Sequence, residues 1–255
     1  MPTFSIVTVV LNDLAGLHKT AESLADQTFT DFEWIVVDGA STEPHPPDPG
    51  ALVPEPTVFI SEPDSGIYDA MNKGWKRSVG EWILFLNAGD ALCQDRTLED
   101  VANKLDDSDA LWAFGMVRNV DQHGQVIGIQ NASPFNRMGQ ALGNTTVPHQ
   151  ATLMRHSLMR NLGGFSLDFG TAADQELIYR AARNGDPCEL VWPVADFEID
   201  GRGMQVPAAQ AVSFLRRARK RQTDYYSNSS VLDLVLTVGI KLSKKMQRSL
   251  ARLAR

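Results

Sequence analysis

The sequence has 255 residues, a length that suits one large α/β domain or one domain with a tail. With 43% hydrophobic and 22% charged residues, it is typical of a soluble globular protein and excludes a disordered or fibrous chain. The net charge of −7 is unevenly divided, since residues 216–255 hold 11 Lys or Arg and only two acids. The remaining body is strongly acidic, which argues against nucleic acid as the main partner, because phosphate binding needs a positive surface.

Strands and helices alternate through the first 108 residues, which predicts a parallel sheet buried on both faces. Fifteen residues, 43–57, contain six prolines and predict a surface loop. β-Branched and apolar runs predict strands at 4–10, 32–37, 57–61 and 81–86, and helical spacing predicts helices at 14–24, 67–77 and 98–105.

The second half of the sequence predicts a mixture of elements. A plausible hairpin turn at 121–124 separates two strands, and the chain beyond Pro207 is expected to be helical and basic. We expect one domain over residues 1–210, with halves of about 1–108 and 109–210, and a helical tail over 211–255. The predicted strands are 110–118, 126–130, 151–154 and 189–194, and the predicted helices are 157–161 and 174–184.

Cys93 and Cys188 lie far apart and match no disulfide or metal-ligand spacing, so we interpret them as reduced thiols of a cytosolic protein. No basic segment precedes the first apolar run, so a secretory signal is not expected. No run reaches the roughly 18 apolar residues that a membrane-spanning helix needs.

Polar side chains follow each of the first four predicted strands. Asn12 follows the first, Asp38 the second, Glu62 and Asp64 the third, and Asp90 the fourth. In open α/β sheets, ligands bind beyond the carboxyl ends of the strands, although Asp and Asn also favour loops for conformational reasons. An acidic pocket without thiols or paired histidines suits Mg²⁺ or Mn²⁺, held by one or two carboxylates and substrate phosphates.

Several motifs of other nucleotide and hydrolase folds are absent. The sequence lacks GxGxxG after the first strand, and it also lacks GxxxxGK[ST], GxSxG and HExxH. The motifs that are present occur in the order SIVTVVLND, WIVVDGAST, SEPDSGIYDAMNKG, GEWILFLNAGD, VPHQATLMR and LGGFSLDFGTAADQELIYRAARNG. Over roughly residues 3–200 this order resembles the GT-A fold glycosyltransferases of family 2, most of all the bacterial enzymes that build exopolysaccharide, capsule or lipopolysaccharide.

The resemblance implies a GT-A fold, with a mainly parallel central sheet flanked by helices, and a nucleotide-sugar site in the first half. Asp38 matches the acid that contacts the nucleotide base, and Asp64 matches a second acid of that pocket. Asn72 lies where the family's helix runs beside the ribose. Asp90 matches the last acid of the metal-binding motif, but Asn87-Ala88-Gly89-Asp90 stands here in place of a double aspartate, which leaves one carboxylate for the metal.

Asp174 matches the family's catalytic base, which would deprotonate the acceptor hydroxyl as it attacks the anomeric carbon. An acid at the start of a helix can also simply interact with the helix dipole. Glu176 is the alternate carboxylate. His149, in the family-like segment PHQA, is expected near the donor diphosphate or the acceptor, and Tyr68 is a candidate for stacking on a base or sugar.

The tail carries an apolar stripe with basic residues along its flank. This pattern resembles an interfacial helix that binds an anionic membrane, but a helix packed on the protein or a dimer contact would have the same pattern. The stripe consists of Val231, Val235, Val238, Leu242, Met246, Leu250 and Leu253, and the flank of Lys241, Lys244, Lys245, Arg248, Arg252 and Arg255.

These observations predict an inverting, metal-dependent hexosyltransferase that moves one sugar from a nucleotide-diphospho-sugar to a glycan or lipid-linked acceptor in cell-surface polysaccharide synthesis. It is expected in the cytoplasm, peripheral on the cytoplasmic face of the inner membrane, and a homo-oligomer is possible. The absence of a QxxRW motif argues against a processive synthase. The alternatives are a non-catalytic module that binds nucleotide sugar or tethers partners to a membrane, and a sugar nucleotidyltransferase. The latter is disfavoured because Leu11-Asn12-Asp13-Leu14 offers no Gly-rich, basic loop.

Overall fold

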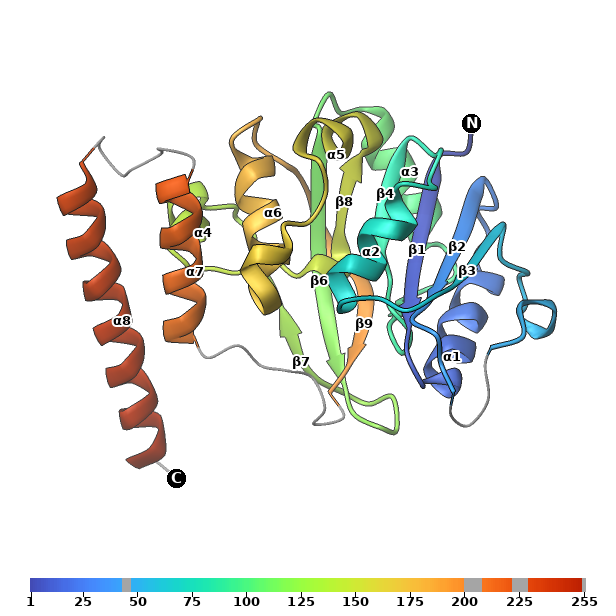
Figure 1. Cartoon of the computed structure of the whole chain (residues 1–255), viewed down its shortest axis with the longest axis horizontal. Coiled ribbons are helices and arrows are strands. Elements are labelled where there is room, and N and C mark those ends of the chain that lie inside the picture. The colour runs from blue at the N-terminus through green and yellow to red at the C-terminus, as the bar shows by residue number, and fades with distance from the viewer. Residues whose placement is uncertain (43–46, 200–207, 222–228, 254–255) are drawn as a thin grey trace.

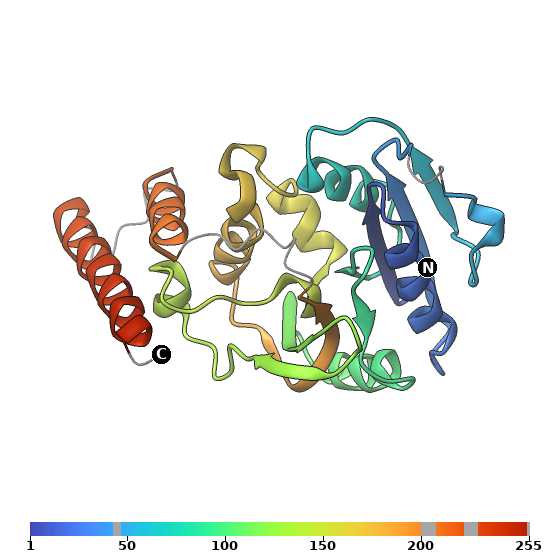
Figure 2. The same cartoon turned by 90° about the horizontal axis from the view of Figure 1, so that it is seen from below.

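The structure is a computed structural model that describes residues 1–42, 47–199, 208–221 and 229–253. The side chains of 208–211, 241 and 244–253 lie outside that description. The described part is an α/β fold built on a single twisted nine-stranded sheet, with the two C-terminal helices beyond one end (Figures 1 and 2).

The sheet has the strand order β3-β2-β1-β4-β8-β6-β9-β5, and β7 pairs with β6. The first four strands in this order are parallel, as is the β6–β9 pair, whereas β8, β7 and β5 pair antiparallel with their neighbours. The strands are β1 (Phe4–Val10), β2 (Phe32–Asp38), β3 (Val58–Ser61), β4 (Trp82–Phe85), β5 (Ala91–Leu92), β6 (Trp112–Val120), β7 (Val126–Gln130), β8 (Thr152–Arg155) and β9 (Cys188–Glu198).

Helices cover both faces of this sheet, so β1 is buried along its whole length and reads as a continuous apolar run. One apolar cluster packs beneath α1 and α3, and the other beneath α2, α5, α6 and α7. The helices are α1 (Leu14–Ala25), α2 (Ile67–Trp75), α3 (Thr97–Asp106), α4 (Arg137–Ala141), α5 (His156–Leu162), α6 (Ala173–Ala182), α7 (Ala208–Arg221) and α8 (Ser230–Leu253), with 3₁₀ turns η1 (Pro49–Ala51), η2 (His149–Ala151) and η3 (Leu167–Ala172).

Helix α2 lies close against the sheet because its inward-facing position 74 is a glycine. A Cβ at Gly74 would lie 2.3 Å from Cγ1 of Val7 in β1 and 3.3 Å from Cγ2 of Val37 in β2. No larger residue fits between these strands and the helix backbone without displacing it. The close approach fixes α2 above the carboxyl halves of β1 and β2.

The predicted mainly parallel α/β fold with a helical C-terminus is confirmed, and most predicted elements form within a few residues of their expected bounds. The hairpin of β6 and β7 turns where expected, with Gly124 at a φ of +74°. Sequence periodicity did not reveal the two-residue strand β5, the short helix α4 or the turn η3. These elements are too short to show a period of 2 or 3.6 residues.

In the C-terminal part, α7 packs on α6, α4 and η3, and α8 packs on α7. Both views place α8 outermost (Figures 1 and 2). A buried ion pair joins the two helices, with Nε of Arg219 2.6 Å from Oδ1 of Asp233. Within the described ranges, no helix is long and apolar enough to cross a membrane.

Candidate active site

The loops after β1 and β2 are tied together by the side chains that the sequence singles out there. Asn12 has a φ of +53°, a conformation that asparagine tolerates, and its Oδ1 accepts a hydrogen bond from the Thr42 amide at 2.8 Å. Ser41 Oγ accepts from the Asn12 amide at 2.7 Å. Asn12 therefore shapes the start of the loop that follows β2.

Asp38 ends β2 and is fully buried. Its carboxylate accepts hydrogen bonds from the Ser41 amide at 3.0 Å and from Ser61 Oγ, at the end of β3, at 2.6 Å. Asp64 is half-buried and accepts from the Gly66 amide at 2.8 Å. A Cβ on Gly39 would lie only 2.5 Å from Oδ2 of Asp64, so the two acids flank one short loop. The structure thus brings Asn12, Asp38 and Asp64 together at the carboxyl ends of β1 to β3.

A second group of polar side chains gathers after β4. Asp90 is 4% exposed, and His149 of η2 and Asp174 at the start of α6 form an ion pair, with His149 Nδ1 3.6 Å from Asp174 Oδ2. On its other side, His149 Nε2 lies 3.4 Å from Nδ2 of Asn87. Residues from three distant segments therefore converge on one cluster, which we call the β4-edge cluster: Asn87, Asp90, His149 and Asp174.

Burial and mutual charge set the protonation of the β4-edge cluster. Burial raises the pKa of Asp90 to about 7, against a smaller opposing effect of His149. Burial lowers the pKa of His149, but Asp174 and the charge of Asp90 outweigh it, so this pKa lies above its usual range. Burial raises the pKa of Asp174, but the hydrogen bonds from His149 and Gln175 and the charge of His149 together outweigh it and leave that pKa below its usual range. Asp174 is thus ionised at neutral pH, and its neighbour His149 keeps its proton to a higher pH than usual.

Gln175 fixes the segment that carries His149 against α6. Its Nε2 donates to the Val147 carbonyl at 2.8 Å, and its Oε1 accepts from the Val147 amide at 3.3 Å. This amide pairing with the backbone holds His149 and Asp174 at a set separation. Gln175 was not predictable as a site residue, since nothing in a sequence marks a buried amide as a bridge between two segments.

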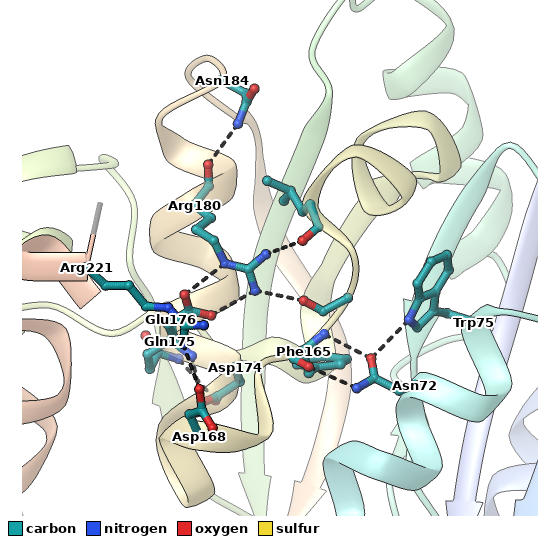
Figure 3. A network of polar contacts seen from close by, with 12 residues as sticks. Asn72, Trp75, Phe165, Asp168, Asp174, Gln175, Glu176, Arg180, Asn184 and Arg221 are labelled. Carbon is teal, nitrogen blue, oxygen red and sulfur yellow. Dashed lines mark hydrogen bonds and ion pairs between the residues drawn. The ribbon is translucent and has the colours of Figure 1, made fainter. Parts of the chain in front are cut away.

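Two of the residues considered at the sequence level have other partners. The carboxylate of Glu176 is nearly buried and pairs with Arg180 at 2.8 Å, so it is part of a structural ion pair (Figure 3). Asn72 is bonded to the backbone of Phe165 in the second half of the chain (Figure 3). Tyr68, on the same helix, has its pKa raised by burial and by the nearby Asp174.

The sequence model described as glycosyl transferase family 2 matches residues 5–161, more than half of the chain. The chain belongs to glycosyl transferase family 2.

Relatives in this family include an uncharacterised glycosyltransferase of Mycobacterium tuberculosis, 34% identical over 220 residues, which cover 85% of this chain and 82% of the relative. A PGL/p-HBAD biosynthesis glycosyltransferase of the same species is 31% identical over 189 residues, covering 72% of this chain and 71% of that protein. The similarity to glycosyltransferases of this family therefore extends over most of the chain.

Solved structures have the same fold. S. aureus TarS in complex with UDP-GlcNAc has a TM-score of 0.66 at 17% identity, over 87% of this chain and 66% of that one. The mannosyltransferase PcManGT from Pyrobaculum calidifontis, in complex with GDP-Man and Mn²⁺, has a TM-score of 0.62 at 16% identity, over 98% and 76%. The predicted GT-A fold of family 2 is confirmed.

Proposed function

We propose that this glycosyltransferase is an inverting enzyme in which Asp174 is the general base. The observation that carries the proposal is the β4-edge cluster, in which a partly buried Asp174 is paired with His149 beyond the carboxyl end of β4. Asp174 removes the proton of the acceptor hydroxyl as its oxygen attacks the anomeric carbon, and the bond to the diphosphate breaks. A carboxylate that remains ionised at neutral pH is ready for this step.

The donor is a nucleotide-diphospho-sugar bound by Asn12, Asp38 and Asp64. Three observations support this part of the proposal: these residues share one edge of the sheet, Asp64 is half-buried, and the similar structures contain UDP-GlcNAc or GDP-Man. Asp38 accepts hydrogen bonds from Ser41 and Ser61, so it would act by shaping the pocket and by presenting its remaining lone pairs to the base. The transferred sugar is expected to be a hexose.

A divalent cation, Mg²⁺ or Mn²⁺, fits the residues after β4. The side-chain oxygen of Asn87 is buried without a hydrogen-bond partner, and the buried carboxylate of Asp90 has a pKa raised to about 7, which a bound cation would lower. Among the described residues, no three His, Cys, Asp or Glu side chains form a metal cluster, so substrate phosphates would complete the coordination. When bound, the cation stabilises negative charge on the leaving diphosphate.

The acceptor is a glycan or a lipid-linked glycan at the cytoplasmic face of the inner membrane, as in cell-surface polysaccharide synthesis. The support comes from α8, whose predicted stripe remains exposed: Val231, Val235, Val238 and Leu242 are 46 to 70% exposed, whereas Asp233 and Thr237 face α7. The basic flank of the stripe lies among side chains outside the described residues. The Lys and Arg side chains of residues 216–255 that are not buried as Arg219 is would add attraction to anionic lipid of about 1 kcal/mol for each one near the surface.

Substitutions on the exposed stripe test this membrane site without removing α7. We expect Val235→Glu with Val238→Glu to abolish co-sedimentation with phosphatidylglycerol vesicles, and the matched pair Ser230→Glu with Ser243→Glu, at exposed polar positions of the same helix, to reduce it much less. Equal loss in both pairs would indicate charge alone. A loss of dimer mass in the first pair, with no vesicle binding by the wild type, would show instead that the stripe joins two copies of the chain.

The experiment that tests the enzymatic function combines binding and turnover. UDP-, GDP- and dTDP-sugars are screened by thermal shift with and without Mn²⁺, and release of nucleoside diphosphate is then measured for each sugar that binds. We expect one class of donor to bind and to be slowly hydrolysed. Binding without transfer or hydrolysis would favour the alternative, a non-catalytic module that only binds nucleotide sugar. The observation behind this alternative is that the Asn87–Asp90 segment has a single carboxylate for a metal.

A further inference from the structure

Helix α2 presents one face to the half of the protein that carries Asp174. Tyr68, Asn72 and Trp75 follow one another at helical spacings of four and three residues, so they share this face. Another side of the helix, which carries Gly74, packs on β1 and β2. One helix therefore contacts the nucleotide half with one side and the acceptor half with the other.

Asn72 bonds to the backbone of a single residue in both directions. Its Oδ1 accepts from the Phe165 amide at 2.9 Å, and its Nδ2 donates to the Phe165 carbonyl at 2.9 Å (Figure 3). The same oxygen accepts from Trp75 Nε1 at 3.0 Å, which occupies its second lone pair. Asn72 is only 8% exposed. A side chain saturated in this way holds the protein together and has no oxygen left for a nucleotide.

Tyr68 approaches the same segment and also Asp174. Its ring centre lies 5.2 Å from that of Phe165, which in turn lies 5.0 Å from the ring of Phe85 in β4. Burial and the nearby Asp174 raise the pKa of the Tyr68 hydroxyl, so the hydroxyl keeps its proton and remains a donor. Tyr68 from α2 and His149 from η2 are thus titratable groups close to Asp174.

The segment that contains Phe165 is held to α6 from its other side. Arg180 of α6 donates to the carbonyls of Leu162 and Gly164, both at 2.7 Å, and pairs with Glu176 (Figure 3). A Cβ on Gly164 would lie 2.4 Å from Asn72 Oδ1, so this position needs a glycine for the contact to form. Residues 162–165 are therefore fixed between α2 and α6, the helix whose first turn carries Asp174.

We propose that Tyr68 and Asn72 are positioning residues for Asp174, Tyr68 through its hydroxyl and Asn72 through the backbone of Phe165. The proposal rests on the function of Asp174 as general base. Asp174 Oδ1 accepts from the Gln175 amide at 2.7 Å and Oδ2 lies 3.6 Å from His149 Nδ1, so donation from Tyr68 would complete the set of groups that orients this carboxylate. The Asn72 bridge sets the distance between α2 and α6. A displacement of about 1 Å in such a group costs up to 100-fold in rate.

Tyr68→Phe tests the direct contact, because it removes the hydroxyl and keeps the ring against Phe165. With the UDP-, GDP- or dTDP-sugar that the wild type hydrolyses in the presence of Mn²⁺, we expect kcat for hydrolysis to fall by about 10- to 100-fold and the donor KM to change by less than about 2-fold. Since donation to the ionised carboxylate favours it, the acid limb of the kcat profile should move to higher pH. Unchanged kcat and an unchanged limb would overturn the proposal.

Asn72→Asp tests the bridge with a side chain of the same shape. The two accepted hydrogen bonds can remain, but an oxygen now faces the Phe165 carbonyl, so Phe165 is pushed away. We expect a lower kcat at an unchanged donor KM. A raised donor KM at unchanged kcat would show instead that Asn72 is a nucleotide ligand, as the resemblance implies.

Two further variants distinguish a failure of the positioning role from general destabilisation and from a failure of the proposed function. Leu105→Ala in α3 lies in the other apolar cluster, so it should lower the melting temperature while leaving kcat per folded molecule unchanged. A fall in kcat there would mean that general destabilisation explains the Tyr68 and Asn72 results. Asp174→Asn reports on the proposed function itself: if it remains active, the base is wrong, whereas an inactive Asp174→Asn with a fully active Tyr68→Phe overturns the positioning role alone.

Discussion

At the scale of single residues, the protonation of Asp174 depends on its neighbours, and on His149 most of all. Burial favours the protonated acid, and the hydrogen bonds from His149 and Gln175 together with the charge of His149 reverse that preference. Asp174 and Asp90 in turn raise the pKa of His149, although burial acts against its charge. The acid and the imidazole therefore ionise as a pair.

This dependence predicts a shift in the pH profile of a His149→Gln variant. Without the imidazolium, burial dominates and the pKa of Asp174 rises, so we expect the acid limb of donor hydrolysis to move to higher pH. The sign follows because only the ionised carboxylate acts as a base, and a higher pKa requires a higher pH to ionise it. The pH dependence of kcat is the measurement, and a limb that stays in place or moves to lower pH would contradict the assigned pairing.

The sequence motifs predicted part of the arrangement of the site residues. Asp90, His149 and Asp174 come together as a cluster, and their motif order pointed to them before any geometry was available. The roles of these residues remain predictions. The partner of Asn72 was not predictable, because its spacing from Tyr68 shows a shared helix face but not that this face meets a segment 93 residues further along the chain.

At the scale of elements, the connection between α2 and α6 depends on two consecutive glycines. Gly163 and Gly164 have φ values of +75° and +83°, so any side chain at either position costs about 1–2 kcal/mol of conformational energy. Only Gly164 also faces a contact, since its Cβ would overlap Asn72 Oδ1 and Trp75 Nε1, whereas nothing lies within 4 Å of a Cβ at Gly163.

The two glycines therefore give a matched pair of variants. We expect Gly163→Ala to lower the free energy of unfolding by about 1–2 kcal/mol, and Gly164→Ala to lower it by a further ~1–3 kcal/mol because overlapping side chains must move. Urea denaturation measures both. Equal losses of unfolding free energy in the two variants would mean that α2 can move away from a side chain at position 164 at no energetic cost. That result would contradict the tight fit between α2 and residues 162–165.

At the scale of the whole molecule, the alternation of strands and helices made the α/β class predictable, because parallel strands need crossover connections that leave a clear period in the sequence. The antiparallel placement of β8 between β4 and β6 was not predictable, since β8 is separated from β4 by about 70 residues and from β6 by about 40, and such distant pairing leaves no local signal. That strand matters for the site, because it follows η2 directly and so carries His149 to the end of β4.

For the C-terminal helices, the sequence predicts the exposed face of α8 but not the residues through which α8 packs on the protein. The stripe of α8 predicted an exposed apolar face, but only the structure shows that the helix contacts α7 through Asp233 and Thr237 instead. Arg217 of α7 lies over the ring of Phe169, 4.7 Å from its centre, and Arg221 pairs with Asp168 at 2.8 Å. The tail is thereby connected to η3, immediately before Asp174.

The central claim is that Asp174 acts on the acceptor hydroxyl and does not bind the donor. Its most direct test compares the wild type with Asp174→Asn, measuring donor binding by thermal shift and release of nucleoside diphosphate in the same preparations. We expect the variant to bind the donor within about 3-fold of the wild type and to lose at least about 100-fold in turnover. Turnover close to that of the wild type, or loss of donor binding together with turnover, would contradict the assignment of Asp174 as the base.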